Sequence, residues 1–361
     1  MLYATSTRII AYAASMSYRG WLVSIVLSAL TYLYNASTLS HPRYNSPCVR
    51  FGAVMRVLYG LFATDFAHYV LGSLALTREG EEQSPDSAFN TRVSTHGPPE
   101  MRIQLVPILG GLFGGNYSFL IWDDTDPQRR AIVVDPADPH VMLQAAKKER
   151  LQVELLLCTH WHFDHSAGNQ TFKRFIPSIE VVASASERGR TPAVTRRVKD
   201  LDELQCGPRL TVRCHHVPGH THGSIVYEVV SKAADGSEGS SGSSLPSAAF
   251  TGDTLFCGGC GALFECSANT LHNSLGLLMS RLPAATKIYP GHEYSEMLMQ
   301  MVCRKEPDNL SARRKLYEVK QRRRQQLPSI PSTVEEELQY NPYLTASRAQ
   351  LAMMCGAAED D

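Results

Sequence analysis

Three histidines and one aspartate lie within six residues, from His160 to His165, directly after an apolar run. The run, residues 155–159, has the composition of a buried strand, and a turn held by such a strand is a common place for functional side chains. An isolated H-x-H is weak evidence for a metal site. The longer pattern H-x-H-x-D-H followed by x-x-Gly-Asn is far more specific, because it lets one turn supply His160, His162, Asp164 and His165 to two metal ions.

Three later residues complete the candidate ligands: His220, Asp253 and His292, each of which follows a strand-like run and a glycine. A glycine lets the backbone turn sharply beside the ligand. Taken singly, each residue is more often a polar group in a turn, whereas together they predict a metal site. Imidazole and carboxylate ligands suit zinc, iron or manganese, and we take two divalent ions, with zinc as the default, as the expected cofactors.

The length and composition of the chain limit which classes of protein it can belong to. A chain of 361 residues that is 43% hydrophobic accommodates one large domain or two ordinary ones and is not wholly disordered. Because 35 basic residues balance 35 acidic ones, no overall charge indicates nucleic acid, and no such partner is expected. Nine cysteines without paired-finger spacing favour reduced thiols in an intracellular compartment.

Residues 1–76 are predicted to be a membrane anchor or a targeting region. The first 64 residues hold five arginines but no Asp or Glu, as in organellar presequences and membrane anchors. Residues 21–34 are apolar but shorter than the ~20 residues that span a bilayer comfortably, so spanning, surface binding and cleavage stay open. Residues 51–76 indicate an amphipathic surface helix, or a buried one. We expect membrane association inside the cell, with the mitochondrion as the alternative.

Residues 77–100 are polar and aperiodic and are predicted to be a linker. We place the catalytic domain at 101–300 and a helical, substrate-binding region at 301–361. Residues 231–247 have the composition of a flexible surface loop. After the linker, the apolar patterns predict strands at 103–109, 117–122, 131–135, 155–159, 180–184, 212–217, 224–230 and 248–253. They also predict helices at 140–148, at 271–280 and from residue 295 onward.

The sequence resembles the glyoxalase II, or hydroxyacylglutathione hydrolase, branch of the metallo-β-lactamase superfamily. The resemblance covers roughly residues 101–345 and includes THWHFDHSAGN, VPGHTHGS, FTGDTLFCGGCGALFE, YPGHEY and YNPYL. It implies an α/β fold, namely the αββα sandwich of that superfamily with a C-terminal helical extension. An acid-free, apolar N-terminus also fits a membrane-associated member of this branch.

The resemblance assigns the ligands. His160, His162 and His220 would hold the first metal, and Asp164, His165 and His292 the second. Asp253 would bridge them. Asp135 would support the site without binding metal, or would simply be a turn residue before a proline.

The resemblance also implies a reaction, the hydrolysis of a small-molecule thioester, with a glutathione conjugate as one candidate substrate. A hydroxide that bridges the metals would be the nucleophile, and Asp164 would relay its proton. The leaving thiolate, with a pKa near ~8.5, needs little help from an acid.

The substrate contacts depart from the family pattern. Glyoxalase II grips glutathione with a Lys and a Tyr from the loop after the bridging Asp, but here residues 260–265 read CGALFE. Tyr294 is retained as a substrate-binding residue, whereas Thr345 replaces the expected Arg and leaves Arg348 as a displaced substitute. A different thioester, or weak activity, is therefore credible.

Two alternatives stay open. One is a persulfide dioxygenase with a single iron, which resembles the same family. The other is a membrane-tethered scaffold with weak or no activity, in which the metal site is chiefly structural. The spacing of Cys257 and Cys260 is that of a redox motif, but no thioredoxin-like context surrounds it, and we expect a structural loop.

Overall fold

The computed structural model describes residues 93–96, 101–108, 115–187, 189–232, 247–347 and 350–351. The predictions for residues 1–76 and for Arg348 lie outside these ranges, as does most of the predicted loop at 231–247. Among the described residues, no helix has both the length and the apolar character needed to cross a membrane.

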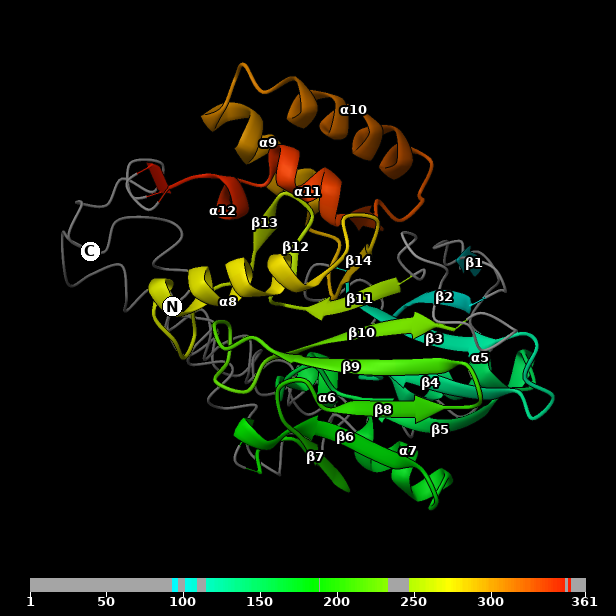
Figure 1. The fold of residues 1–361 in the computed structure, drawn as a ribbon. Helices are drawn as coiled ribbons and strands as arrows, with labels where there is room; N and C mark the ends of the chain where they lie inside the picture. The colour runs from blue at the N-terminus through cyan, green and yellow to red at the C-terminus, as the bar shows by residue number, and fades with distance from the viewer. Residues whose placement is uncertain are drawn as a thin grey trace, which may run out of the picture. The chain divides into compact units, whose positions relative to one another are not determined.

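The first sheet has seven strands in chain order (Figure 1). The first four are antiparallel neighbours and the last four are parallel ones. They are β1 (Val93–His96), β2 (Met101–Pro107), β3 (Tyr117–Asp123), β4 (Arg130–Val134), β5 (Gln152–Leu157), β6 (Glu180–Ser184) and β7 (Arg196–Val198).

The second sheet has six strands in the order β15-β14-β11-β10-β9-β8, and all its pairs are antiparallel except β11 with β14. A separate two-stranded hairpin, β12 (Leu255–Phe256) with β13 (Gly259–Cys260), follows β11. The strands of the second sheet are β8 (Glu203–Cys206), β9 (Leu210–His216), β10 (Ile225–Ser231), β11 (Ser247–Gly252), β14 (Lys287–Pro290) and β15 (Ser332–Thr333).

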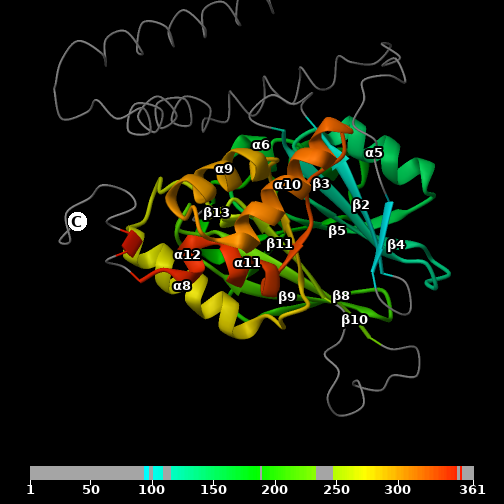
Figure 2. The same ribbon diagram turned by 90° about the horizontal axis from the view of Figure 1, so that it is seen from above.

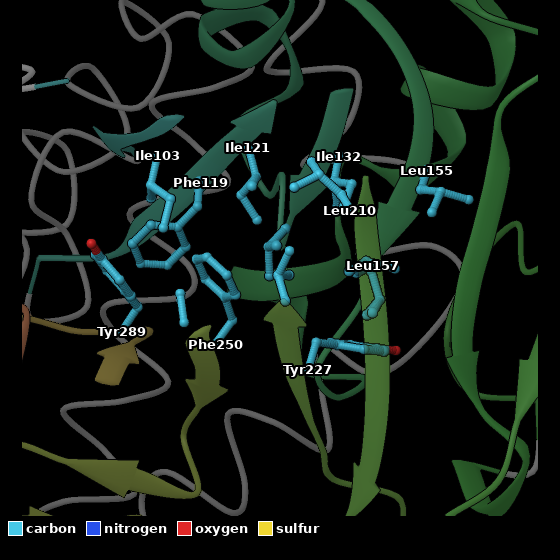
Figure 3. Close-up of a cluster of buried hydrophobic side chains, with 14 of the residues drawn as sticks. Ile103, Phe119, Ile121, Ile132, Leu155, Leu157, Leu210, Tyr227, Phe250 and Tyr289 are labelled. Atoms are coloured by element: carbon cyan, nitrogen blue, oxygen red, sulfur yellow. The ribbon is translucent and has the colours of Figure 1, made fainter. Parts of the chain in front are cut away.

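The main core lies between the facing sides of these two sheets (Figure 3). Phe119 from the first sheet meets Phe250 and Tyr289 from the second, with ring centroids 5.1 and 5.5 Å apart. Fully burying a large apolar side chain stabilises the fold by about 1.5–3 kcal/mol. This shared core holds the two sheets, and therefore the loops at their ends, in a fixed relation.

Helices cover the outer face of each sheet. On the first sheet, α5 (Pro139–Lys148) and α7 (Asn169–Phe175) bury Met142 and Phe172 against the strands. On the second, α8 (Ala268–Arg281) buries Leu271 and its neighbours one helical turn apart. The predicted αββα sandwich is confirmed.

The C-terminal region is helical, as predicted. Its helices are gathered together in both Figure 1 and Figure 2, and α9 and α10 pack against the β12–β13 hairpin around Cys257. The predicted domain boundary at residue 300 falls inside the first of them. They are α9 (Ser295–Lys305), α10 (Leu310–Arg324), α11 (Val334–Tyr340) and α12 (Pro342–Thr345).

The structure contains several strands that were not predicted from the sequence, among them β1, β7 and β8. β1 lies in the segment that we predicted to be an aperiodic linker, and it pairs with β2 in the register His96 to Met101. Strands β7 and β8 were not predicted. An edge strand needs only backbone pairing with its neighbour, so a polar segment can form one without an apolar pattern.

Candidate metal centre

All seven predicted ligands are buried, and they come from four segments that follow strands. The turn after β5 carries His160 and His162 and runs into the short helix α6 (Phe163–Ser166), which carries Asp164 and His165. The other three follow strands of the second sheet: His220 after β9, Asp253 directly after β11 and His292 after β14. The centre therefore lies where the two sheets present the ends of their strands.

The first set of ligand atoms consists of three imidazole nitrogens. His162 Nδ1 lies 3.0 Å from His160 Nε2 and 3.0 Å from His220 Nε2. The three atoms lie within 4.8 Å of one another, which suits binding to one ion.

The second set combines two imidazoles and a carboxylate. His292 Nε2 lies 3.3 Å from His165 Nε2 and 3.5 Å from Asp164 Oδ2. Asp164 Oδ2 is also 3.9 Å from His165 Nε2. These atoms form a second cluster of the same size as the first.

Asp253 faces both sets. Its Oδ1 lies 3.3 Å from both His165 Nε2 and His292 Nε2, and its Oδ2 lies 3.7 Å from His220 Nε2. One carboxylate thus presents one oxygen to each set. This is the arrangement that the bridging role requires.

Hydrogen bonds on the far sides of the rings fix which nitrogens face the centre without a proton. His220 Nδ1 lies 2.8 Å from the Ala262 carbonyl oxygen, which can only accept, so His220 donates there. His165 donates in the same way from Nδ1 to Asp135 Oδ2 at 2.9 Å. The Nε2 atom of each ring therefore faces the centre and presents a lone pair there when the ring is neutral, which is how metal-binding histidines are commonly oriented.

The charge environment also fits cations. Burial and the neighbouring histidines lower the pKa of His160, which keeps it neutral, as metal binding requires. Burial opposes a charge on His165, but three carboxylates, Asp253, Asp164 and Asp135, outweigh it and raise the pKa of His165. Around the second set the protein therefore favours positive charge, which a divalent ion would supply.

Asp135 supports the turn after β5 that carries His160 and His162. Directly after β4, it has a left-handed backbone with φ of 50°. Its Oδ1 accepts from the Thr159 amide at 2.8 Å, and its Oδ2 accepts from the Thr159 hydroxyl at 2.6 Å as well as from His165. Of our two interpretations of Asp135, the geometry favours the supporting role.

Asp135→Asn is expected to lower metal affinity about 10- to 100-fold, because an amide nitrogen in the place of Oδ2 is a donor and can accept from neither Thr159 nor His165. Competition with a chelator measures the affinity. Asp202→Asn is the control. Asp202 belongs to neither ligand set and accepts a hydrogen bond from the Lys199 amide at 2.8 Å. Equal affinities in the two variants would contradict the supporting role.

Tyr294, predicted to bind substrate, stacks on His292 with ring centroids 4.8 Å apart and 2° between the planes. Burial and the carboxylates of Asp253 and Asp164 raise the pKa of Tyr294. Its phenol is therefore protonated at neutral pH and able to donate a hydrogen bond.

The sequence analysis missed two residues of the centre. Asn116 Nδ2 donates to Asp164 Oδ2 at 3.2 Å, and its backbone forms an isolated bridge with His292. Phe264 stands edge-on to His162 and His220, with ring centroids 5.3 and 5.0 Å apart. A single Asn before a strand belongs to no recognisable motif. The contact between Asn116 and Asp164 could therefore not be predicted from the sequence.

Comparisons with known proteins agree with this fold. Residues 111–232 match the model of the metallo-β-lactamase superfamily, and residues 293–361 match that of the hydroxyacylglutathione hydrolase C-terminus. A solved metallo-β-lactamase from Staphylococcus aureus subsp. aureus COL has the same fold, with a TM-score of 0.52 at 20% identity over 72% of this chain and 67% of that one.

Two curated relatives are closer in sequence. The cytoplasmic hydroxyacylglutathione hydrolase of Arabidopsis thaliana is 36% identical over 256 residues, which cover 71% of this chain and 92% of the relative. The hydroxyacylglutathione hydrolase-like protein of Gallus gallus is 32% identical over 259 residues, 72% of this chain and 85% of the relative.

The fold and the His/Asp centre define a metallo-β-lactamase superfamily protein. Within it, this chain belongs to the hydroxyacylglutathione hydrolase family. The predicted family and the predicted class of enzyme, a metal-dependent hydrolase, are confirmed.

Proposed function

We propose that this protein hydrolyses thioesters with two divalent metal ions, most simply zinc. The observation that carries the proposal is the position of Asp253, whose two carboxylate oxygens face two separate sets of ligands. Two complete sets favour a dinuclear hydrolase over the alternative dioxygenase with one iron. The names of the two curated relatives support a glutathione thioester as the first substrate to try.

When bound, two such ions lower the pKa of a water molecule towards ~7 and polarise the substrate carbonyl. His160, His162 and His220 would hold one ion, and Asp164, His165 and His292 the other, with Asp253 shared. No nucleophilic side chain is needed, and a thiolate leaves without strong acid assistance.

The remaining chemistry belongs to side chains around the ions. Asp164 Oδ1 has no hydrogen-bond partner among the described residues and is the atom that we propose to hold the proton released during hydrolysis. Tyr294, with its neutral phenol beside His292, would orient the substrate. Phe264 would shield the first set of ligands from water.

The test is hydrolysis of S-D-lactoylglutathione by the full chain and by His162→Ala, with oxygen consumption followed in parallel. We expect turnover without oxygen uptake, and a loss of at least about 10³-fold in the variant, because metal polarisation contributes several kcal/mol to the transition state. His140→Ala, which replaces a histidine of α5 outside both ligand sets, should retain activity. Absence of turnover on any thioester by the metal-loaded protein would favour the scaffold alternative.

Association with an intracellular membrane rests on residues 1–76 alone and stays a prediction.

A further inference from the structure

A partly buried carboxylate, Glu265, joins the two segments that carry the first set of ligands. Its Oε1 accepts from Trp161 Nε1 at 3.0 Å, and its Oε2 accepts from the His222 amide at 2.7 Å. Trp161 lies between two of the ligands in the chain, and His222 lies two residues after the third ligand, His220. One side chain therefore connects the turn after β5 to the turn after β9.

Arg190 holds Glu265 in this position. Its NH2 atom donates to Glu265 Oε2 at 2.9 Å and its NH1 atom pairs with Oε1, so the guanidinium binds both carboxylate oxygens. The same guanidinium lies over the ring of Trp161, 4.6 Å from the ring centroid. A planar group that stacks on a ring and binds a carboxylate at two points restricts both partners. Glu265 and Trp161 are therefore fixed relative to each other.

A second carboxylate, Glu187, extends these contacts to the residue that follows His220. Glu187 is fully buried, and its two oxygens accept from Arg190 NH2 at 3.0 Å and from the Thr221 hydroxyl at 2.8 Å. Arg190 thus bridges two carboxylates, and each carboxylate holds a residue close to His220 in the chain. The backbone after His220 is fixed at two successive positions.

The loop that carries Glu265 also contacts the ligands directly. The Phe264 ring stands edge-on to those of His162 and His220, with centroids 5.3 and 5.0 Å away. The Ala262 carbonyl accepts from His220 Nδ1 at 2.8 Å. Because Glu265 anchors the end of this loop, its contacts also bear on the orientation of the His220 ring.

The second set of ligands is supported by other side chains. His165 donates to Asp135 Oδ2 at 2.9 Å, and Asn116 donates to Asp164 Oδ2 at 3.2 Å. A change at Glu265 should therefore act on the first set and spare the second.

We infer that Glu265 is a positioning residue for the first metal ion, because it holds the turns that carry His162 and His220 at the spacing that one ion requires. This inference rests on the proposed two-metal function. Residues that orient metal ligands from behind contribute to metal affinity, since ligands that are already in place lose little freedom on binding.

Glu265→Gln is the variant that tests this role. Each Glu265 oxygen accepts from two donors, so an amide nitrogen at either position must face two donors instead. In a His292→Ala background, which leaves the first set complete, we expect Glu265→Gln to lower metal affinity about 10-fold or more. In a His220→Ala background, which leaves the second set complete, the same change should not alter the affinity. Chelator competition with zinc measures both affinities.

Asp200→Asn is the matched control. Asp200 accepts from Arg281 NH1 and NH2 at 2.9 and 3.0 Å and from the His216 amide at 2.9 Å, so this variant also disrupts a guanidinium pair and a backbone hydrogen bond. It should leave both affinities unchanged. Trp161→Phe removes the Nε1 donor but keeps an aromatic ring, and it should weaken the first set by a smaller factor than Glu265→Gln.

The metal content of the otherwise unchanged chain separates this inference from the proposed function. Fewer than two ions in the parent protein would overturn the two-metal function and this inference with it. With two ions in the parent, Glu265→Gln should lose one of them at a chelator concentration that the parent withstands. A general loss of stability would instead weaken both backgrounds alike. Equal losses in the two backgrounds, or no loss in either, would overturn the inference alone.

Discussion

Asp253→Ala is expected to remove both metal ions and to reduce thioester hydrolysis at least about 10³-fold. Asp253 presents one carboxylate oxygen to each ligand set, at 3.3 Å from His165 Nε2 and 3.7 Å from His220 Nε2. Without it the histidine nitrogens of both sets lose their shared negative partner. Metal content by mass spectrometry and hydrolysis rate on the same sample measure the effect.

Asp126→Ala is the matched control for this variant. Asp126 is also buried and holds Arg130 through a 2.7 Å contact, so its loss also deprives the fold of a buried carboxylate. The control protein should lose stability but keep its metals and most of its activity. If Asp253→Ala retained two ions, or if Asp126→Ala lost them equally, Asp253 would not be the bridge.

Gly261→Ala is expected to lower the free energy of unfolding by at least about 2 kcal/mol and to weaken metal binding at the first ligand set. A Cβ at Gly261 would lie 1.7 Å from the Asp253 carbonyl oxygen and 3.1 Å from His220 Nδ1. The closer contact is with backbone, which cannot rotate away, so Ala262 and its hydrogen bond to His220 must shift. Denaturant unfolding and chelator competition measure the two effects.

Gly276→Ala provides the contrast in the same protein. Gly276 is exposed in the middle of α8, and a Cβ there would meet no atom within 4 Å. Alanine should raise the free energy of unfolding by about 0.5–1 kcal/mol, because glycine has the lower helix propensity. Equal stabilities of the two glycine variants would contradict the close approach at Gly261.

The sequence predicted most of the fold because many of its strands, such as β3, β10 and β11, are buried on both faces. β3, β5 and β10 each appear as a short apolar run bounded by polar residues, and the structure places each within one to three residues of the prediction. The seven candidate ligands could likewise be located by spacing, since the four segments that carry them follow such runs. Local pattern was enough wherever a strand delivers its side chain directly to the site.

Contacts between distant segments could not be predicted in this way. Asn116 reaches Asp164 across 48 positions, and Arg190 reaches Glu265 across 75, with no pattern that links them. At the start of α11, Ser332 and Thr333 both carry hydroxyl groups that can cap a helix, and Thr333 does so in a reciprocal pair with Glu336. The pairing of β15 with β14 places the helix start after Thr333.

We propose that two metal ions share this chain's His/Asp centre through Asp253. The most direct test is the metal content of the purified full chain, measured by mass spectrometry after loading and removal of loosely bound ions. We expect close to two divalent ions per chain, and we expect Asp253→Ala to lose them. A single iron per chain, unchanged by excess zinc, would contradict it and would favour the dioxygenase.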